Sequence, residues 1–316
     1  MIVNPPSYAQ RCARKRGVAL LGVIWVIAIL ALACVTALRV ISFDTEIAGA
    51  KIHGSRALQI AEMGVALGCH PQVKRSDPIL RQMNESTGEG FEVRLAFEGG
   101  RFNINFILQN DDRALLRDIF IYWGLELDAA QAVVDAMADW VDADDNTSLN
   151  GAEAKDYEKL ERFNQPFNRP FYDVNEMRLV LGMELVEAMN PNWRQWFTVW
   201  SSGPLDVNDA NTEMIALAAE CTPEQAEIIP ERVRGVDAAR DTIDDAPFQD
   251  AAAALDLLGI DANGRPDLAA RFTADDSTIR IESTGYSGGA KRKIKIILRN
   301  RTGRPVLLER TEEIIP

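Results

Sequence analysis

The sequence has little histidine and little cysteine. Two of its 316 residues are histidine and four are cysteine. A histidine-rich metal site or a Ser-His-Asp triad therefore has almost no material, and we expect a protein that is not an enzyme. The cysteines form no C-x-x-C pair, so a zinc ribbon or a thioredoxin-like motif has no support. Cys12 and Cys34 lie in the N-terminal segment. For Cys69 and Cys221, a disulfide and two free thiols both remain open.

Basic residues are also fewer than acidic residues. The chain has 34 lysines and arginines against 47 aspartates and glutamates, which gives a formal net charge of −13. A surface that binds nucleic acid has to be basic, so the composition argues against a nucleic-acid partner. With 21 glycines and 14 prolines, the chain is neither collagen-like nor low-complexity. Its 47% hydrophobic content is typical of a folded protein, and its length suggests about two domains.

One long hydrophobic run is present near the N-terminus. Basic residues cluster at 11–16, and residues 18–38 then follow without a charge. As a helix this segment spans roughly 31 Å, which matches the hydrocarbon core of a bilayer. The basic flank should stay in the cytoplasm. We therefore expect a single-pass membrane protein whose C-terminal body lies outside the cytoplasm. A cleaved secretory signal fits less well, because its apolar region is shorter and is followed by small residues.

The junction between the basic cluster and the apolar run has no spacer. Gly17 follows Arg16, and Val18 begins the run directly. This arrangement resembles the leader of type IV pilins and secretion-system pseudopilins, in which a prepilin peptidase cuts after the glycine. The resemblance implies cleavage between Gly17 and Val18, with 1–17 as the leader and 18–38 as the retained transmembrane helix. A plain membrane anchor is the alternative.

The helical pattern continues beyond the apolar run. Small and apolar residues recur at spacings of three and four, which is typical of one face of a helix. These residues are Ile47, Ala50, Gly54, Leu58, Ala61, Val65 and Gly68. The next proline is Pro71. One helix of roughly fifty residues is therefore predicted, and 39–70 would be its periplasmic half, packed on a globular head.

Alternation of apolar and polar residues predicts strands in two distant parts of the chain. Residues 91–97 and 101–106 alternate around a Gly-Gly turn, which predicts a hairpin. Three more strands are predicted near the C-terminal end: 278–283 alternates, 293–298 alternates less strictly, and 305–309 follows a turn at 301–304. Two or three strands are marginal on their own. We therefore expect one antiparallel sheet, built from 71–110 and 273–316 and backed by the N-terminal helix.

The region between these strands has helical periodicity. Segments 112–123 and 128–140 have apolar residues at helical spacing. Further helices are expected near 174–188, 211–220, 223–233 and 248–258, with Asn211, Thr222 and Asp250 as caps. The predicted fold class is α+β: a pilin-like long N-terminal helix packed on a small antiparallel sheet, with a large all-α domain, 111–272, inserted between strands. Two consecutive domains with separate small sheets are the alternative.

An acidic loop follows the predicted helix that ends at Trp140. Asp142, Asp144 and Asn146 occupy positions 1, 3 and 5 of this loop. Glu153 occupies position 12, where calcium loops place a bidentate carboxylate. Calcium takes six to eight oxygen ligands, and the stretch can supply most of them. We therefore predict a structural calcium ion with these four residues as ligands. A solvated acidic turn that caps a helix is the alternative.

The other loop positions qualify this prediction. Thr147 occupies position 6, where an EF-hand has glycine, so a standard EF-hand turn is not expected. Ser148 and Asn150 are expected to add a backbone carbonyl and a side chain or water, and Leu149 to anchor the loop to the core. A second acidic turn at 261–265 is excluded, because its last residue is an arginine at a ligand position.

The acidic loop also carries a resemblance to a known family. The sequence is similar to the minor pseudopilin K of type II secretion (general secretion pathway protein K). The matching positions are Asp139-Trp140, Asp142, Asp144, Gly151-Ala152-Glu153, Tyr157, Pro170-Phe171, Asn175, Leu181-Gly182-Met183 and 100–105. The resemblance implies a helical domain that is inserted in a pilin sheet and braced by calcium. Carried over by motif, Asp142, Asp144 and Glu153 are the implied ligands.

Gly22 is the fifth residue after the predicted cleavage site. Most pilin-like subunits carry a glutamate there, whereas the protein K family lacks it, which is taken to mark the fibre tip. The resemblance thus implies a minor pseudopilin at the tip of the pseudopilus, which helps to initiate the fibre and to export folded proteins. Its implied partners are other minor pseudopilins, the inner-membrane secretion platform, the prepilin peptidase and secreted substrate. The alternatives are a minor pilin of an adhesive type IV fibre and a membrane-anchored periplasmic metal-dependent hydrolase.

Overall fold

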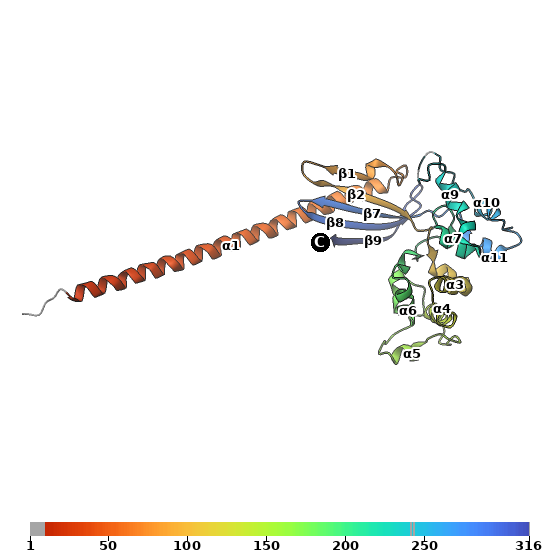
Figure 1. Ribbon diagram of the computed structural model, residues 1–316, viewed down its shortest axis with the longest axis horizontal. Helices are drawn as coiled ribbons and strands as arrows, with labels where there is room; N and C mark the ends of the chain where they lie inside the picture. The colour runs from red at the N-terminus through yellow and green to blue at the C-terminus, as the bar shows by residue number, and fades with distance from the viewer. Residues whose placement is uncertain (1–9, 241, 243, 316) are drawn as a thin grey trace, which may run out of the picture.

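A single long helix forms the N-terminal part of the computed structural model, which describes residues 10–240, 242 and 244–315. This helix, α1, runs over Gln10–Gly68 and projects far beyond the rest of the molecule (Figure 1). Residues 19–48 are exposed along it. In the described part of the chain, α1 is the one helix long and apolar enough to cross a membrane. The first nine residues of the predicted leader lie outside the described residues.

The C-terminal part of α1 packs on a five-stranded antiparallel sheet (Figure 1). The order of the strands is β1-β2-β7-β8-β9. Their bounds are β1 Arg81–Asn84, β2 Glu89–Phe97, β7 Thr278–Ser287, β8 Ala290–Arg299 and β9 Val306–Ile315, with a short 3-10 helix η1, Pro78–Leu80, before β1. Strands β2 and β7 pair from Gly90↔Tyr286 to Phe97↔Ile279, although the whole helical region separates them in sequence. The predicted α+β class is confirmed.

Small residues let α1 approach the sheet closely. A Cβ on Gly285 of β7 would lie 2.1 Å from the carbonyl oxygen of Ala57 and 2.5 Å from the backbone nitrogen of Ala61. A Cβ on Gly64 would lie 2.3 Å from the Ser283 hydroxyl. Any larger side chain at these glycines would have to move the helix off the sheet. The buried face of α1 is therefore set by glycine and alanine rather than by large apolar residues.

The predicted helix face is only partly the buried one. Gly54, Ala61, Val65 and Gly68 are buried against the sheet, as are Ala57 and Gly64. The two earliest members of the predicted set, Ile47 and Ala50, are exposed. They precede the point where α1 reaches the sheet. The helical spacing of apolar residues therefore begins before the part of α1 that contacts the sheet.

The predicted hairpin of 91–97 and 101–106 is wrong. The hairpin partner of β2 is β1, whose four residues are all exposed and so show no alternation. Residues Phe102–Asn103 form β3, which pairs with a strand of the helical region instead. The side chain of Asn103 then accepts hydrogen bonds from the backbone N–H groups of Asn105 and Phe106. This cap starts helix α2 in the middle of the predicted strand.

Between β2 and β7 the chain forms short helices around a second apolar core. The α-helices are α2 Ile104–Gln109, α3 Arg113–Tyr122, α4 Leu127–Val141, α5 Ala154–Glu158, α6 Met183–Met189, α7 Thr212–Ala219, α8 Pro223–Ala226, α9 Ile228–Arg234, α10 Ala251–Leu257 and α11 Pro266–Ala269. The 3-10 helices η2 Val174–Leu179 and η3 Trp193–Gln195 complete them. Two short parallel ladders pair β3 with β4 (Phe197–Thr198) and β5 (Leu205–Asp206) with β6 (Phe272–Thr273). The buried residues form one cluster that includes Trp140, Trp193 and Phe197.

The caps of this region confirm three predictions, and one predicted helix is broken. Asn211, Thr222 and Asp250 cap α7, α8 and α10 through their side chains. The expected helix at 174–188 is instead the pair η2 and α6. Gly182 separates them with φ +87°, and a Cβ there would lie 2.7 Å from the Val133 side chain. A left-handed glycine packed against α4 therefore interrupts the helix.

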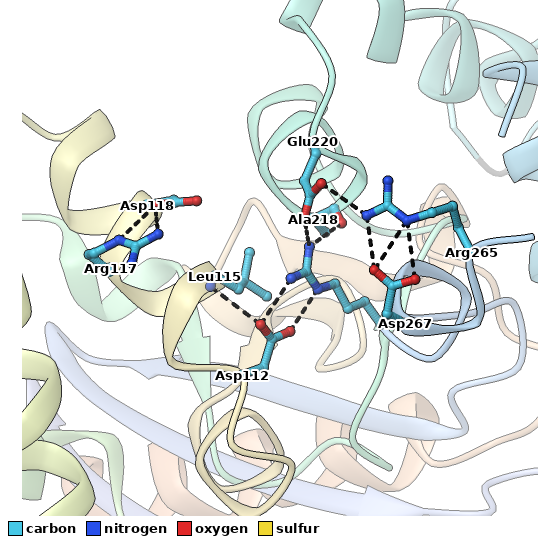
Figure 2. A network of polar contacts seen from close by, with 9 residues as sticks. Asp112, Leu115, Arg117, Asp118, Ala218, Glu220, Arg265 and Asp267 are labelled. Carbon is cyan, nitrogen blue, oxygen red and sulfur yellow. Dashed lines mark hydrogen bonds and ion pairs between the residues drawn. The ribbon is translucent and has the colours of Figure 1, made fainter.

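A polar network joins the two ends of the helical region. Asp112 caps α3, and its carboxylate also accepts hydrogen bonds from Arg271, which precedes β6, at 2.6 and 2.9 Å. Arg271 donates further to the carbonyl of Ala218 and to Glu220, at the end of α7. Figure 2 shows Asp112, Ala218 and Glu220 converging, with Arg265 and Asp267 continuing the network. Segments far apart in sequence are thus fastened into one unit.

Candidate functional site: the acidic loop and the N-terminal helix

The acidic loop joins α4 to α5. Asp142 ends α4 and Glu153 precedes α5. The rings of Trp140 and Tyr157 are fully buried and lie edge to face, with centroids 5.5 Å apart. These two aromatic residues hold the ends of the loop together.

Asp139 lies inside the turn of the loop. Its side chain is fully buried, and its two oxygens accept a hydrogen bond from the Ser148 backbone N–H at 3.0 and 3.2 Å. A Cβ on Gly151 would lie 1.9 Å from Asp139 Oδ2, so glycine is required there. The loop is therefore wrapped around a buried carboxylate.

Several buried oxygen atoms beside this carboxylate lack donors. Both carboxylate oxygens of Glu153 and Oδ1 of Asp142 have no hydrogen-bond partner among the described residues. The same is true, within that part of the chain, of the amide oxygens of Gln165 and Asn168. Asn168 lies beside the loop, because its Nδ2 donates to the Asp144 carbonyl at 3.4 Å. Buried polar atoms are normally paired, and a group of oxygen acceptors of this kind is chemically suited to a cation.

The carboxyl groups also disturb one another's protonation. Burial, followed by the charges of Asp139 and Asp142, raises the pKa of Glu153 to about 7. Burial, followed by Asp144 and Asp139, raises the pKa of Asp142. Burial and repulsion between carboxylates both disfavour the charged forms. A hard cation such as calcium prefers an oxygen-only donor set of this kind and would remove the repulsion when bound.

The structure brings together only part of the predicted ligand set. Asp142 and Glu153 are close enough to influence each other, whereas Asp144 and Asn146 are exposed. Asp144 Oδ1 accepts a hydrogen bond from the Asn146 backbone N–H at 2.8 Å. In residues 10–240, 242 and 244–315, no group of three His, Cys, Asp or Glu side chains could hold a metal ion by itself. Amide, backbone or water oxygens would have to complete a calcium site.

The minor loop positions differ from expectation. Leu149 is 96% exposed, so its predicted role as an anchor is wrong. The buried carboxylate of Asp139 holds the loop instead. The Ser148 carbonyl accepts a hydrogen bond from Gly151, and Asn150 donates to Asp135. Both residues therefore brace the loop from within.

The spacing of residues in the loop did not predict that Asp139, Gln165 and Asn168 carry buried side-chain oxygens. Asp139 precedes the first calcium-loop position, and its burial follows from the apolar face of α4. Gln165 and Asn168 lie in a segment without regular periodicity. The approach of Asn168 to the loop is produced by tertiary packing, including the ring of Phe167 against Trp140 at 5.0 Å.

The residues predicted to determine leader cleavage and fibre assembly lie on α1. The predicted cleavage junction, Gly17–Val18, falls within this continuous helix. A Cβ on Gly22 would meet no described atom within 4 Å. Near the other end of α1, Cys69 is a free thiol in the described structure, as is Cys221 in the helical region. The sheet and the C-terminal part of α1 together form the head of the molecule. No disulfide therefore joins the head to the helical region through this pair.

Comparisons with known proteins agree with one another. The family described as type II secretion system (T2SS), protein K matches residues 100–192. Type II secretion system protein K of Pseudomonas aeruginosa is 29% identical over 247 residues, which cover 68% of this chain and 71% of the relative. The Dickeya chrysanthemi protein of the same name is 34% identical over 70 residues, 22% of this chain and 19% of the relative.

A solved structure has the same fold. It is a chain of the GspK-GspI-GspJ complex from the type 2 secretion system of enterotoxigenic Escherichia coli. The TM-score is 0.62 at 14% sequence identity, with 86% of this chain and 98% of that chain covered. The likeness therefore extends over both the head and the helical region.

Proposed function

The chain belongs to the type II secretion protein K family of minor pseudopilins, and we propose that it forms the tip of the pseudopilus. The observation that carries this proposal is the position of the helical region. It lies at the end of the sheet opposite to the membrane-spanning part of α1 (Figure 1). In a fibre whose subunits stack along their N-terminal helices, this mass occupies the space of the next subunit. The role is architectural rather than catalytic.

Gly22 supports the same position. A carboxylate inside a bilayer is costly unless it is paired, so a subunit that carries one needs a neighbour. Gly22 brings no such charge, and the subunit can therefore end a fibre. This subunit would initiate the fibre from the inner membrane and take part in the export of folded proteins.

The membrane topology is part of the proposal. The apolar part of α1 would cross the inner membrane, with the sheet and the helical region in the periplasm. Prepilin peptidase would cut between Gly17 and Val18 and leave α1 attached. Mass spectrometry of the mature protein is expected to find Val18 at its N-terminus. An N-terminus at Met1, or one beyond Leu38, would contradict this.

The proposed partners are other minor pseudopilins and the inner-membrane secretion platform. The related fold was solved in a complex of three such proteins, which supports this assignment. The exposed apolar residues of α1 beyond the membrane-spanning stretch, such as Ile41 and Phe43, offer a surface for helix packing. Secreted substrate would meet the helical region.

Calcium is proposed as a structural ion of the acidic loop. Asp142 and Glu153 would hold it directly, and Asp144 and Asn146 are the other predicted ligands. The unsatisfied amide oxygen of Asn168, which lies beside the loop, supports the presence of a cation. The ion would fix α4, α5 and the following segment relative to one another.

Labelled fibres test the position at the tip. An epitope tag beside Val236, which is 97% exposed, should not disturb the fold. Immunogold particles are expected at one end of each pseudopilus. The same tag on the major pseudopilin is the control and should label the whole shaft. Labelling of this chain along the shaft would overturn the proposal.

A further inference from the structure

A cavity opens where the sheet meets the helical region. Its volume is about 550 Å³. The lining residues are Arg94, Leu95 and Ala96 of β2, Arg101, Arg194 and Gln195 near η3, and Arg280 and Glu282 of β7. Val93 and Ile281 belong to the core under α1. Because side chains alternate along a strand, Arg94, Arg280 and Glu282 point to the opposite face of the sheet.

A buried glutamate lies within ion-pair distance of two of these arginines. Glu98 is 2% exposed and accepts a hydrogen bond from the Thr198 hydroxyl at 2.5 Å. Its Oε1 lies 3.6 Å from Arg280 Nη1 and 3.9 Å from Arg101 Nη1. Burial lowers the pKa of Arg101, which shows that its guanidinium has lost part of its hydration. A cation in this state gains more from an incoming anion than a fully hydrated one does.

The other two arginines are held from different elements. The guanidinium of Arg194 stacks on Trp193, with its carbon 4.4 Å from the ring centroid, and its Nε donates to the Asn175 amide oxygen at 2.9 Å. Arg94 is exposed and lies opposite Glu282 on the neighbouring strand. Glu282 is itself engaged by Lys293 at 2.8 Å. The four guanidinium groups thus converge from β2, the loop after it, η3 and β7.

This charge is opposite in sign to that of the chain. Four arginines and one glutamate line the cavity, and two further carboxylates, Glu98 and Glu187, pair with three of these arginines. The guanidinium groups still outnumber the carboxylates, whereas the whole protein has a net charge of −13. Guanidinium groups bind carboxylates through two parallel hydrogen bonds. The cavity is much larger than a single inorganic anion, so it has room for a peptide segment that carries a carboxylate.

We propose that this arginine pocket binds a carboxylate-bearing segment of a protein partner, presented as an extended acidic peptide. The site lies on the face of the sheet that α1 leaves open, so the ligand reaches it without any change in the helix packing. The pocket also spans the junction of the two regions. An acidic segment bound there would contact both the sheet and the helical region.

Peptide binding to the full chain in zwitterionic detergent tests the proposal. The probe is a short, fluorescent oligoglutamate with blocked ends, measured by anisotropy, and an oligoglutamine of equal length is the neutral control. Arg94→Gln should weaken oligoglutamate binding at least fivefold, and Arg94→Glu should abolish it. Because Arg94 is exposed, both variants should keep the melting temperature of the parent chain. The matched control is Lys291→Gln, which removes one exposed positive charge at the other end of the same sheet.

The outcomes separate the proposal from general electrostatics. Binding that survives about 0.15 M salt, is lost in the Arg94 variants and is kept within twofold in Lys291→Gln supports the pocket. Equal losses in Arg94→Gln and Lys291→Gln would overturn it, as would equal binding of oligoglutamine. Competition by inorganic phosphate at the same concentration as the peptide would show a free-anion site and overturn the peptide assignment.

Discussion

In the head, α1 and the sheet meet over glycine and alanine, whereas the helical region is held by caps, ion pairs and buried aromatic rings. The head has regular strands that pair over up to ten residues. The helical region consists of short helices, many of them under two turns, that share one core. The comparison teaches that close backbone approach stabilises the first region and that side-chain contacts stabilise the second.

The largest effect is expected from filling the contact between α1 and the sheet. Gly285→Ala places a Cβ against the backbone of α1, which cannot yield as a side chain can. We expect it to destabilise the head by about 3 kcal/mol. Hydrogen exchange of β7 and β8 amides would measure this, while α4 amides should change little. Gly303→Ala, in a turn where a Cβ meets no described atom within 4 Å, is the control. Equal exchange in both variants would contradict the close contact.

The acidic loop provides the corresponding test in the helical region. Asp142→Asn combined with Glu153→Gln should abolish most of the calcium-dependent rise in melting temperature. For the parent chain, calcium at a hundredfold excess over the dissociation constant is expected to stabilise the fold by about 2.7 kcal/mol. Five of the six tryptophans lie in this region, so fluorescence reports its unfolding. Asp261→Asn, in the excluded acidic turn, should keep the full shift. A full shift in the double variant would refute the site.

A titration tests the junction between the two regions. Asp206 is buried in β5, and its carboxylate accepts N–H groups of Asn208 and Asp276. Burial raises the pKa of Asp206 to about 6, although the two hydrogen bonds lower it, and repulsion from Asp209 raises it further. The folded state therefore holds this proton more tightly than the unfolded state does. Protonation of Asp206 therefore adds on the order of 2 kcal/mol to the free energy of unfolding below about pH 4. This contribution is lost as the pH rises to about 6.

Urea unfolding of the parent chain and of Asp206→Asn, compared between pH 4 and 7, isolates this contribution. The difference between their free energies of unfolding should change with pH in that window and stay constant above it. Asp267→Asn, at an exposed position, is the control and should give a flat difference. A flat difference for Asp206→Asn would show that the junction does not perturb this carboxyl.

The smallest effect is expected at Gly22. A glutamate there has room, since a Cβ would meet no described atom within 4 Å. Its cost should be well below the roughly 2.5 kcal/mol of a charge at the bilayer centre, because it lies near the membrane edge. Gly22→Glu should reduce the number of fibres modestly, counted by electron microscopy, with Gly22→Gln as the uncharged control. Gold label should remain at one end, because the helical region still blocks stacking. Label along the shaft would show that Gly22 alone excludes the subunit from it.

Much of the fold could be predicted where one residue pattern determines one structure. The apolar run, the helical spacing of α1 and the alternation in β7 to β9 each gave the right element. Asn211, Thr222 and Asp250 correctly predicted where their helices begin, because a cap acts within a single turn. Strand β1 was not predicted, because its residues are exposed on an edge and carry no alternation.

The acidic loop shows the limit of prediction for a site. Spacing along the chain singled out Asp142 and Glu153, since both flank the loop, and the structure places these two side chains close to each other. Leu149 was misplaced, because hydrophobicity alone does not say whether a loop residue faces the core. Asn168 is brought to the loop by the packing of the aromatic rings around Trp140, and a local sequence pattern does not predict such a tertiary contact. The arginine pocket was missed for the same reason, because its residues come from four separate elements.

The pairing of β2 with β7 has a consequence for the order of folding. Phe97 lies opposite Ile279, so both ends of the helical region leave the sheet side by side. An unfolded insertion of this length makes closure of the strand pair slow, because loop entropy must be overcome before the ladder forms. A helical region that has already folded brings its two ends together and removes most of that barrier. We therefore expect strands β7 to β9 to complete the head after the insertion has become compact, so that the folded insertion acts as an internal template for the sheet.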